Sequence, residues 1–394
     1  MQTGQSQFPA VPELDPACRA RQAAAHRRQF LVQAAVLAVV FAVLYWLAGN
    51  VVDNLEQRNI RSGFEFLKNA SNIEIGEASL AFSSSDSVAR AFFVGLLNTL
   101  KVSFFAVISA TVLGIIVGLM RLTAHPILRL LGTAHVEFYR NIPLIIQLFA
   151  IYLLITELLP MSTDAVSLGG WALLSKAGLQ VAVPKQALLS LTAAGLAGIL
   201  TLFLVRLYAL RNMTGLMANL TGVLGGFAMA IVVWLLFGWL SGWSKPVIEG
   251  FSIEGGAALS PEFLALWLGL TLFTSASIAE IVRAGVIAVP PGQWNAGLAL
   301  GMTRVQTVSY VIFPQSMKLA VPPLASQYMN LTKNSSLAVV IGYPDLVAIG
   351  NSTINITGQA LEVILLIMAV YLTINLVISV LMNALNARVT RTVR

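Results

Sequence analysis

Eight apolar stretches, each close to the length of a membrane-spanning helix, constrain the fold of this chain more than any other feature. About 20 residues, at a rise of about 1.5 Å each, cross a hydrocarbon core of about 30 Å. This pattern predicts an all-α integral membrane protein with about eight transmembrane helices. The stretches cover residues 30–52, 92–120, 142–159, 187–209, 219–240, 263–289, 319–343 and 361–383.

The composition agrees with a membrane protein. Hydrophobic residues make up 57% of the chain and charged residues only 10%, whereas soluble domains carry about a quarter charged residues. Cys18 is the single cysteine, so an internal disulfide, a thiolate metal cluster and a redox pair are excluded. The net charge of +7 is explained by the position of the basic residues and does not indicate nucleic-acid binding.

The first apolar stretch predicts a retained transmembrane helix over residues 30–52. Four arginines lie close before it, at positions 19, 21, 27 and 28. The stretch is too long for the apolar region of a signal peptide, and no small-residue cleavage site follows it. We expect residues 1–29 to form a cytoplasmic tail and residues 53–91 to form a periplasmic loop.

The distribution of basic residues predicts which ends of the helices are cytoplasmic. Eight spans place both termini on one side, and cytoplasmic loops carry the excess of Lys and Arg. With both termini inside, fifteen of the 24 Lys and Arg residues are cytoplasmic and seven are outside. The sequence therefore predicts a multi-pass membrane protein with both termini cytoplasmic, whose last residues, 386–394, form a second cytoplasmic tail.

Two of the spans contain features that predict irregular helices. The stretch 142–159 is short, so its helix is expected to begin earlier, near His135. The stretch 319–343 contains Pro322 and Pro323, followed by polar residues. Such residues are tolerated where neighbouring helices or a water-filled cavity satisfy the freed backbone groups. We therefore expect a broken helix after the two prolines.

Residues 290–318 are too polar to span a membrane and connect the sixth and seventh spans. Pro290, Pro291 and Gly292 break the incoming helix. Apolar residues then recur at helical spacing, which predicts two short amphipathic helices hinged near Gly301. These residues are Trp294, Leu298, Met302, Val305, Val308 and Ile312. An amphipathic helix of this kind binds either in a protein groove or at a membrane surface.

The same segment resembles the coupling loop of ABC importer permeases. Gly301 and Pro314 match that family's spacing, as does Ala296, whereas Asn295 stands in place of Glu and Gly297 in place of Ala. The resemblance implies docking into a cleft of an ATPase subunit. The missing carboxylate removes a possible contact with an arginine and hints at a heterodimer of permeases. The implied coupling residues are Trp294, Asn295, Ala296, Gly297, Leu298, Gly301, Met302, Arg304 and Pro314.

Further motifs resemble the permeases that take up histidine, glutamine and arginine. They lie at residues 95–100, 137–144, 279–285 and 328–337. The resemblance implies an importer permease domain over residues 92–385 with five core helices and a cytoplasmic coupling helix. The extra helices, at 30–52 and inserted at about 187–240, make the chain similar to the larger permease of the general L-amino acid importer and of the related glutamate/glutamine/aspartate/asparagine importer. The resemblance also implies a location in a bacterial inner membrane. Implied partners are a second permease, an ABC ATPase dimer, a periplasmic binding protein and an L-amino acid.

Polar residues inside the spans are candidates for the substrate pathway because burying them in lipid is costly. Glu280 and Arg283 are three residues apart and are expected to pair on one helix face. Lys101 either faces the pathway or pairs with Glu280. Each residue could instead serve packing: an ion pair at the helix end, or a polar kink near Lys333. The candidates are Asn98, Lys101, Gln147, Glu280, Arg283, Asn330, Lys333, Ser335 and Ser336.

The chain lacks the motif that would let it hydrolyse ATP. A P-loop needs a glycine directly before its lysine, and none of the seven lysines follows a glycine. We therefore expect a non-catalytic subunit that binds no cofactor or metal, while a partner ATPase uses ATP and Mg²⁺. Two alternatives remain open: an ion-coupled secondary amino acid transporter, and a structural subunit that does not translocate.

Overall fold

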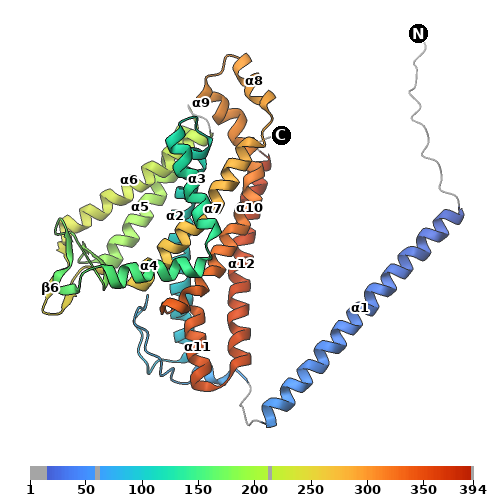
Figure 1. Ribbon diagram of the computed structural model, residues 1–394, viewed down its shortest axis with the longest axis horizontal. Coiled ribbons are helices and arrows are strands. Elements are labelled where there is room, and N and C mark those ends of the chain that lie inside the picture. The colour runs from blue at the N-terminus through green and yellow to red at the C-terminus, as the bar shows by residue number, and fades with distance from the viewer. Residues whose placement is uncertain (1–15, 58–62, 212–214, 392–394) are drawn as a thin grey trace. The chain divides into compact units, whose positions relative to one another are not determined.

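The computed structural model describes residues 16–57, 63–211 and 215–391. It divides into two compact units, Met1–Gly63 and Phe64–Arg394. In the first unit, α1 is one continuous helix over Pro16–Gln57 (Figure 1). The predicted span 30–52 lies within this helix, whereas residues 1–15 of the predicted tail lie outside the described residues.

The second unit is built mainly from helices (Figure 1). Its longer helices are α2 (Val88–Leu122), α3 (Pro126–Asn141), α4 (Leu144–Leu158), α5 (Ala187–Ala209), α6 (Gly215–Ser241), α7 (Pro261–Ile287), α8 (Pro291–Ala299), α10 (Phe313–Asn334), α11 (Leu346–Thr357) and α12 (Ala360–Arg391). Shorter helical turns are Glu65–Lys68, Ser162–Asp164, α9 (Arg304–Thr307), a π turn at Val308–Ile312, and a 3₁₀ segment at Ser335–Ile341.

The number of possible membrane spans agrees with the sequence. Among the described residues, six helices are long and apolar enough to cross a membrane by themselves. Two further pairs pass the same test together: α3 with α4, bent by 106°, and Arg304–Ile341 with α11, bent by 51°. Counting each bent pair as one span gives up to eight.

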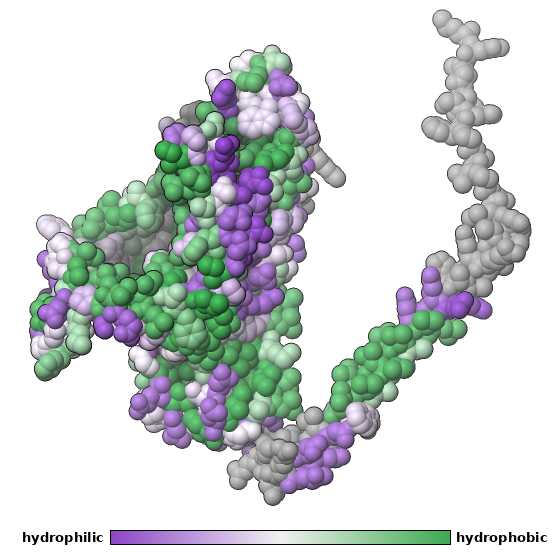
Figure 2. Space-filling view, in the orientation of Figure 1, coloured by the Kyte–Doolittle hydropathy of each residue, from purple (hydrophilic) through white to green (hydrophobic). Residues whose placement is uncertain are grey.

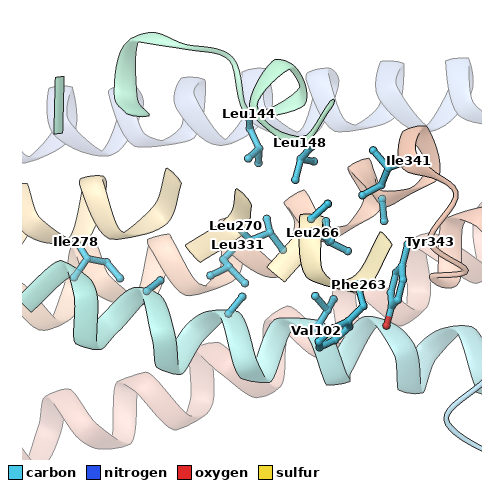
Figure 3. Close-up of a cluster of buried hydrophobic side chains, with 14 of the residues drawn as sticks. Val102, Leu144, Leu148, Phe263, Leu266, Leu270, Ile278, Leu331, Ile341 and Tyr343 are labelled. Carbon is cyan, nitrogen blue, oxygen red and sulfur yellow. The ribbon is translucent and has the colours of Figure 1, made fainter. Parts of the chain in front are cut away.

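The core of the second unit lies where α2, α4, α7 and α10 meet. In Figure 3, Val102, Leu148, Leu266 and Leu331, one from each of these helices, converge on the same interior. In a bilayer, such contacts stabilise mainly by close van der Waals packing, because lipid tails are as apolar as leucine. The surface of the unit carries broad hydrophobic areas (Figure 2), as expected for a protein solvated by lipid.

Small residues bring α2 and α7 into close contact. A Cβ built on Gly114 would lie 2.6 Å from Cβ of Ile278, and one on Gly118 would lie 2.9 Å from the carbonyl oxygen of Ala279. No side chain fits at either position without moving the neighbouring helix. The spacing of the two glycines is that of a small-xxx-small packing motif.

The inserted helices α5 and α6 form a hairpin that packs through glycines. A Cβ on Gly198 would lie 2.9 Å from the carbonyl oxygen of Gly226, and a Cβ on Gly226 would lie 2.6 Å from that of Gly198. The base of the hairpin is tied by antiparallel pairing of the strands on either side, at Val183–Pro184 and Trp243–Ser244. Residues 212–214 of the turn lie outside the described residues.

Short β-strands flank the inserted hairpin, and the sequence analysis did not predict them. Their segments turn at glycines with positive φ, such as Gly169 and Gly170. Four strands form an antiparallel sheet in the order β1-β2-β3-β8, and two further pairs are β4-β5 and β6-β7. The strands are β1 (Val166–Leu168), β2 (Ala172–Ser175), β3 (Gly178–Val181), β4 (Val183–Pro184), β5 (Trp243–Ser244), β6 (Val247–Glu249), β7 (Ser252–Glu254) and β8 (Ala257–Leu259).

Of the two expectations about irregular spans, the first is wrong in position and the second is confirmed. The helix of the third span does not begin near His135: α3 starts at Pro126 and ends at Asn141. Ile142 is extended before Pro143, since a residue preceding proline avoids the helical region, and α4 starts afresh. The seventh span is broken after its two prolines, as expected: α10 runs through both prolines and ends at Asn334. A 3₁₀ segment follows, which closes with Gly342 at φ +81°.

Candidate functional site

The segment between α7 and α10 forms a compact helical hairpin at one end of the second unit (Figure 1). The chain leaves α7 at Ile287, and α8 begins at Pro291, where a proline suits the first helical turn. Gly301 has φ +72°, a left-handed conformation that glycine adopts without strain. The hinge predicted at Gly301 is therefore confirmed. We call residues 291–307, which comprise α8 and α9, the α8–α9 hairpin.

The second short helix of this hairpin is continuous with the following span. Thr303 caps α9 through a capping box, in which its side chain accepts from Gln306 N and Gln306 Oε1 accepts from Thr303 N. The chain then passes through the π turn into α10, whose first turn contains Pro314. The helical segment thus begins at Arg304, earlier than the stretch 319–343 indicated.

The two arms of the hairpin touch through a glycine. Gly297 is buried, and a Cβ at this position would lie 2.7 Å from Thr307 Cγ2 and 2.9 Å from Thr307 Oγ1. Thr307 Oγ1 donates to the carbonyl of Thr303 at 3.1 Å, which fixes its rotamer. Gly297, which stands in place of the usual alanine, therefore leaves room for the side chain of Thr307 on the facing arm.

Apolar side chains of the hairpin are exposed although the segment is too polar to span a membrane. Leu300 at the tip is 78% exposed, and Asn295, Ala296 and Arg304 are exposed beside it. Trp294 and Met302 are half-buried. Exposed apolar side chains rimmed by polar groups are typical of a protein interaction surface. The exposed large apolar residues of this region are Leu298, Leu300, Val305, Val308 and Tyr310.

The helix α10 exposes a polar face along its C-terminal half. Ser326, Asn330 and Lys333 are exposed, and their spacing of four and three residues places them on one side of the helix. Figure 2 shows hydrophilic side chains gathered over the region where α7, α10 and α12 lie in Figure 1. A polar face on a spanning helix avoids lipid by facing a partner helix or water. Two of the predicted pathway residues, Asn330 and Lys333, belong to this face.

Ser335 and Ser336 follow this face but bond to their own backbone. Ser335 Oγ is buried and donates to the carbonyl of Thr332 at 2.7 Å, and Ser336 Oγ donates to that of Lys333 at 2.7 Å. These bonds satisfy carbonyls at the end of α10, where the 3₁₀ segment begins. The serines therefore shape the break in the helix.

An ion-pair cluster joins α2 and α7 near the α8–α9 hairpin. The predicted pair is confirmed, since Arg283 Nη2 donates to Glu280 Oε1 at 2.8 Å. Arg121 at the end of α2 also donates to the Glu280 carboxylate. The sequence did not indicate this second partner, because 159 residues separate it from Glu280. A carboxylate shared by two guanidinium groups holds the two helices together.

A second polar cluster joins the N-terminal half of α2 to the start of α7, and it corrects one expectation. Lys101 does not pair with Glu280: its Nζ donates to Glu77 Oε1 at 2.6 Å. Asn98 is fully buried, and its Nδ2 donates to the carbonyls of Glu77 at 2.8 Å and Pro344 at 2.9 Å. The segment before α2, which carries Glu77, contributes a residue that the sequence analysis did not select.

Gln147 supports the bend between α3 and α4. Its Nε2 donates to the carbonyls of Tyr139 at 2.9 Å and Ile142 at 2.8 Å, which are carbonyls at the end of α3 without a helical partner. The side chain is buried. His135 of α3 connects that helix to α7, because its Nε2 lies 2.9 Å from Oγ of Ser275 on α7.

The described residues contain no group of three or more His, Cys, Asp or Glu side chains that could hold a metal ion. The polar groups gather instead in the two clusters that join α2 to α7, on α10 and in the α8–α9 hairpin. This arrangement is suited to connecting helices and to contacting other chains.

Comparisons with known proteins agree with this arrangement. Residues 110–391 match the family described as "Binding-protein-dependent transport system inner membrane component". Protein YhdX of Escherichia coli (strain K12) is 40% identical over 373 residues, which cover 92% of this chain and 94% of that protein.

Two further relatives carry the names that the sequence resemblance implied. The general L-amino acid transport system permease protein AapQ of Rhizobium johnstonii is 36% identical, over 92% of each chain. The glutamate/glutamine/aspartate/asparagine transport system permease protein BztB of Rhodobacter capsulatus is 35% identical, over 91% of this chain and 93% of that protein. The chain therefore belongs to the family of binding-protein-dependent transport system inner membrane components, within its amino acid ABC permeases.

Proposed function

We propose that this chain is the translocating permease subunit of an ATP-driven importer that carries L-amino acids from the periplasm to the cytoplasm. The family and the names of its relatives support an amino acid as the substrate. The observation that carries the proposal is the α8–α9 hairpin, which exposes Leu298 and Leu300 between two spanning helices. Its place in the chain suits a segment that docks on an ATPase and passes motion to the membrane.

The contacts between helices supply a route for that motion. The helix α7 ends at Ile287, and a short connection joins it to α8, which begins at Pro291. A displacement of α8 therefore acts directly on α7. The helix α7 is joined to α2 by the Glu280 cluster, by Gly114 against Ile278, and through Glu77 at the far end. A displacement of α9 acts on α10, because the two are continuous. The hairpin thus connects to both α7 and α10, which pack against each other in the core, so a movement of the hairpin would shift these two helices and open or close a path beside α10.

The polar face of α10 supports a second permease subunit as a partner. Lys333 and Asn330 on this face would line the path between the two permeases. The other pathway candidates, Asn98, Lys101, Gln147, Glu280, Arg283, Ser335 and Ser336, would support the path through their contacts within the subunit. Asn295, in place of the usual glutamate, favours a heterodimer, in which the other permease docks its ATPase more tightly. The remaining partners in this proposal are an ABC ATPase dimer, which uses ATP and Mg²⁺, and a periplasmic amino acid binding protein.

The proposed topology places the hairpin in the cytoplasm. Residues 1–29 and 386–394 are then cytoplasmic tails, 30–52 is an additional transmembrane helix, 53–91 is periplasmic, and 92–385 is the permease domain with its insertion at 187–240 and coupling loop at 290–318. The β-strands and the Glu77 segment face the periplasm in this topology. The excess of basic residues on the hairpin side supports it.

Uptake by the purified complex tests the proposed function. Proteoliposomes containing both permeases and the ATPase would receive ATP on the hairpin side, and labelled amino acids with binding protein on the other. We expect accumulation that requires ATP and stops with a non-hydrolysable analogue. Accumulation driven by a sodium or proton gradient without ATP would contradict the proposal and favour a secondary transporter.

A further inference from the structure

Glu77 joins three parts of the second unit although it lies on a non-helical segment. Its backbone carbonyl accepts from Asn98 Nδ2 at 2.8 Å, and its Oε1 accepts from Lys101 Nζ at 2.6 Å; both partners are on α2. Its other carboxylate oxygen accepts from Ser260 Oγ. Ser260 is the N-cap residue of α7, whereas Asn98 and Lys101 lie inside α2, which begins at Val88. Glu77 therefore connects the N-terminal half of α2 to the start of α7.

The two charges of this cluster are partly buried but accessible. The Lys101 side chain is 30% exposed and that of Glu77 is 17% exposed. Lys101 Nζ lies 4.7 Å from the centroid of the Phe263 ring, which adds a favourable cation–π contact. In such surroundings the effective dielectric constant is about 20, compared with about 80 in water, and charges act more strongly on one another.

The segment that carries Glu77 is attached at its base. Ser71 N donates to the carbonyl of Asp86 at 2.8 Å, and Asn72 N donates to that of Ser84 at 2.9 Å. Glu77 lies between these bonds, on the loop that they close, and the charge contacts hold the loop against α2 and α7. The ammonium of Lys101 and the carboxylate of Glu77 have opposite formal charges, so the ion pair is formally neutral.

The neutrality of the Glu77–Lys101 ion pair affects how charged substrates are attracted or repelled. Without Glu77, the Lys101 ammonium would attract anionic amino acids that pass close to it and would repel cationic ones. Without Lys101, the Glu77 carboxylate would do the reverse. Resting on the proposed function, we propose that Glu77 determines substrate specificity by neutralising Lys101, so that anionic, neutral and cationic amino acids enter alike.

Uptake of three amino acids of different charge tests this inference. Reconstituted complexes would be compared for ATP-dependent kcat/KM with glutamate, glutamine and arginine. In Glu77→Gln, we expect kcat/KM to rise about tenfold for glutamate and to fall about tenfold for arginine, so that their ratio rises about a hundredfold, as for one unit charge about 10 Å from the substrate at an effective dielectric constant of about 20. In Lys101→Gln, the ratio should fall by a similar factor.

Two double variants separate charge from structure. Glu77→Gln with Lys101→Gln, and the exchange of Glu77→Lys with Lys101→Glu, both keep the cluster neutral, so each should return the ratio close to that of the unaltered complex. Glu74→Gln removes an exposed carboxylate from the same segment and should leave the ratio unchanged.

Failure of the inference about Glu77 and failure of the proposed function give different results. If Glu77→Gln changes the uptake of all three amino acids by the same factor, Glu77 is only a structural clamp and the inference is overturned. If the unaltered complex takes up none of the three with ATP, the proposed function itself fails, and the inference fails with it.

Discussion

Gly297 of α8 lies so close to Thr307 of α9 that a Cβ on the glycine would be 2.7 Å from Thr307 Cγ2. The β-branched threonine is stiff at χ1, and its hydroxyl donates to the Thr303 carbonyl. The arms of the hairpin would therefore have to separate to admit a methyl group.

We expect Gly297→Ala to lower ATP-dependent uptake about tenfold, because overpacking of a close contact costs about 1–3 kcal/mol. Adding Thr307→Ala removes both Cγ2 and Oγ1 and should restore most of the uptake. The measurement is uptake by the reconstituted complex. Full activity of the single variant, or no recovery in the double variant, would show that this contact does not set the shape of the hairpin.

A second prediction concerns the contact between α2 and α7. Gly114→Ala places a methyl group 2.6 Å from the side chain of Ile278, and we expect it to destabilise the protein by about 1–3 kcal/mol. The matched control is Gly195→Ala in α5, where a Cβ meets nothing within 4 Å, and where alanine favours the helix by about 0.5–1 kcal/mol. Thermal unfolding in mild detergent should show a lower Tm only for Gly114→Ala; equal Tm values for the two variants would refute the close contact.

The Glu280 cluster gives a third prediction. Glu280→Gln leaves Arg121, which is only 11% exposed, facing Arg283 without a counter-charge. Breaking a fully buried pair costs about 3–5 kcal/mol, and we expect about 2 kcal/mol here because the cluster is partly exposed. Adding Arg121→Gln removes one of the two cations and should recover part of the loss in Tm.

An exposed acid provides the control for that measurement. Glu249→Gln changes a carboxylate on β6 that is exposed and should leave Tm unchanged. A double variant that is less stable than Glu280→Gln by the full cost of Arg121→Gln would contradict the idea that the three residues act as one cluster.

The sidedness of the protein gives a fourth prediction. Phe251 in the β6–β7 turn is 94% exposed, and Leu300 at the hairpin tip is 78% exposed. In a Cys18→Ser background, Phe251→Cys should react with a membrane-impermeant thiol reagent added to intact spheroplasts, whereas Leu300→Cys should react only after permeabilisation. The opposite pattern would reverse the topology.

The sequence predicts the features that depend on short-range patterns. The apolar stretches, the hinge at Gly301 and the Glu280–Arg283 pair all follow from residues close together in the chain, and the structure contains them. The family was inferred from short sequence motifs, and the family match and the similar relatives confirm it.

The features that the sequence did not predict depend on long-range contacts or lie in very short elements. Lys101 pairs with Glu77, and Arg121 joins Glu280, through the packing of α2 on α7, which no local pattern encodes. The short β-strands carry two to four residues each, too few for a period-2 pattern to stand out.

Site-specific cross-linking from the hairpin tests the central claim most directly. A photoreactive residue at Leu300 in the assembled complex should form a covalent product with the ATPase subunit, and the yield should change when ATP is added. The same probe at Phe251 should form no such product. A hairpin probe that reacts only with lipid or with the partner permease, while the ATPase is present and active, would contradict the account.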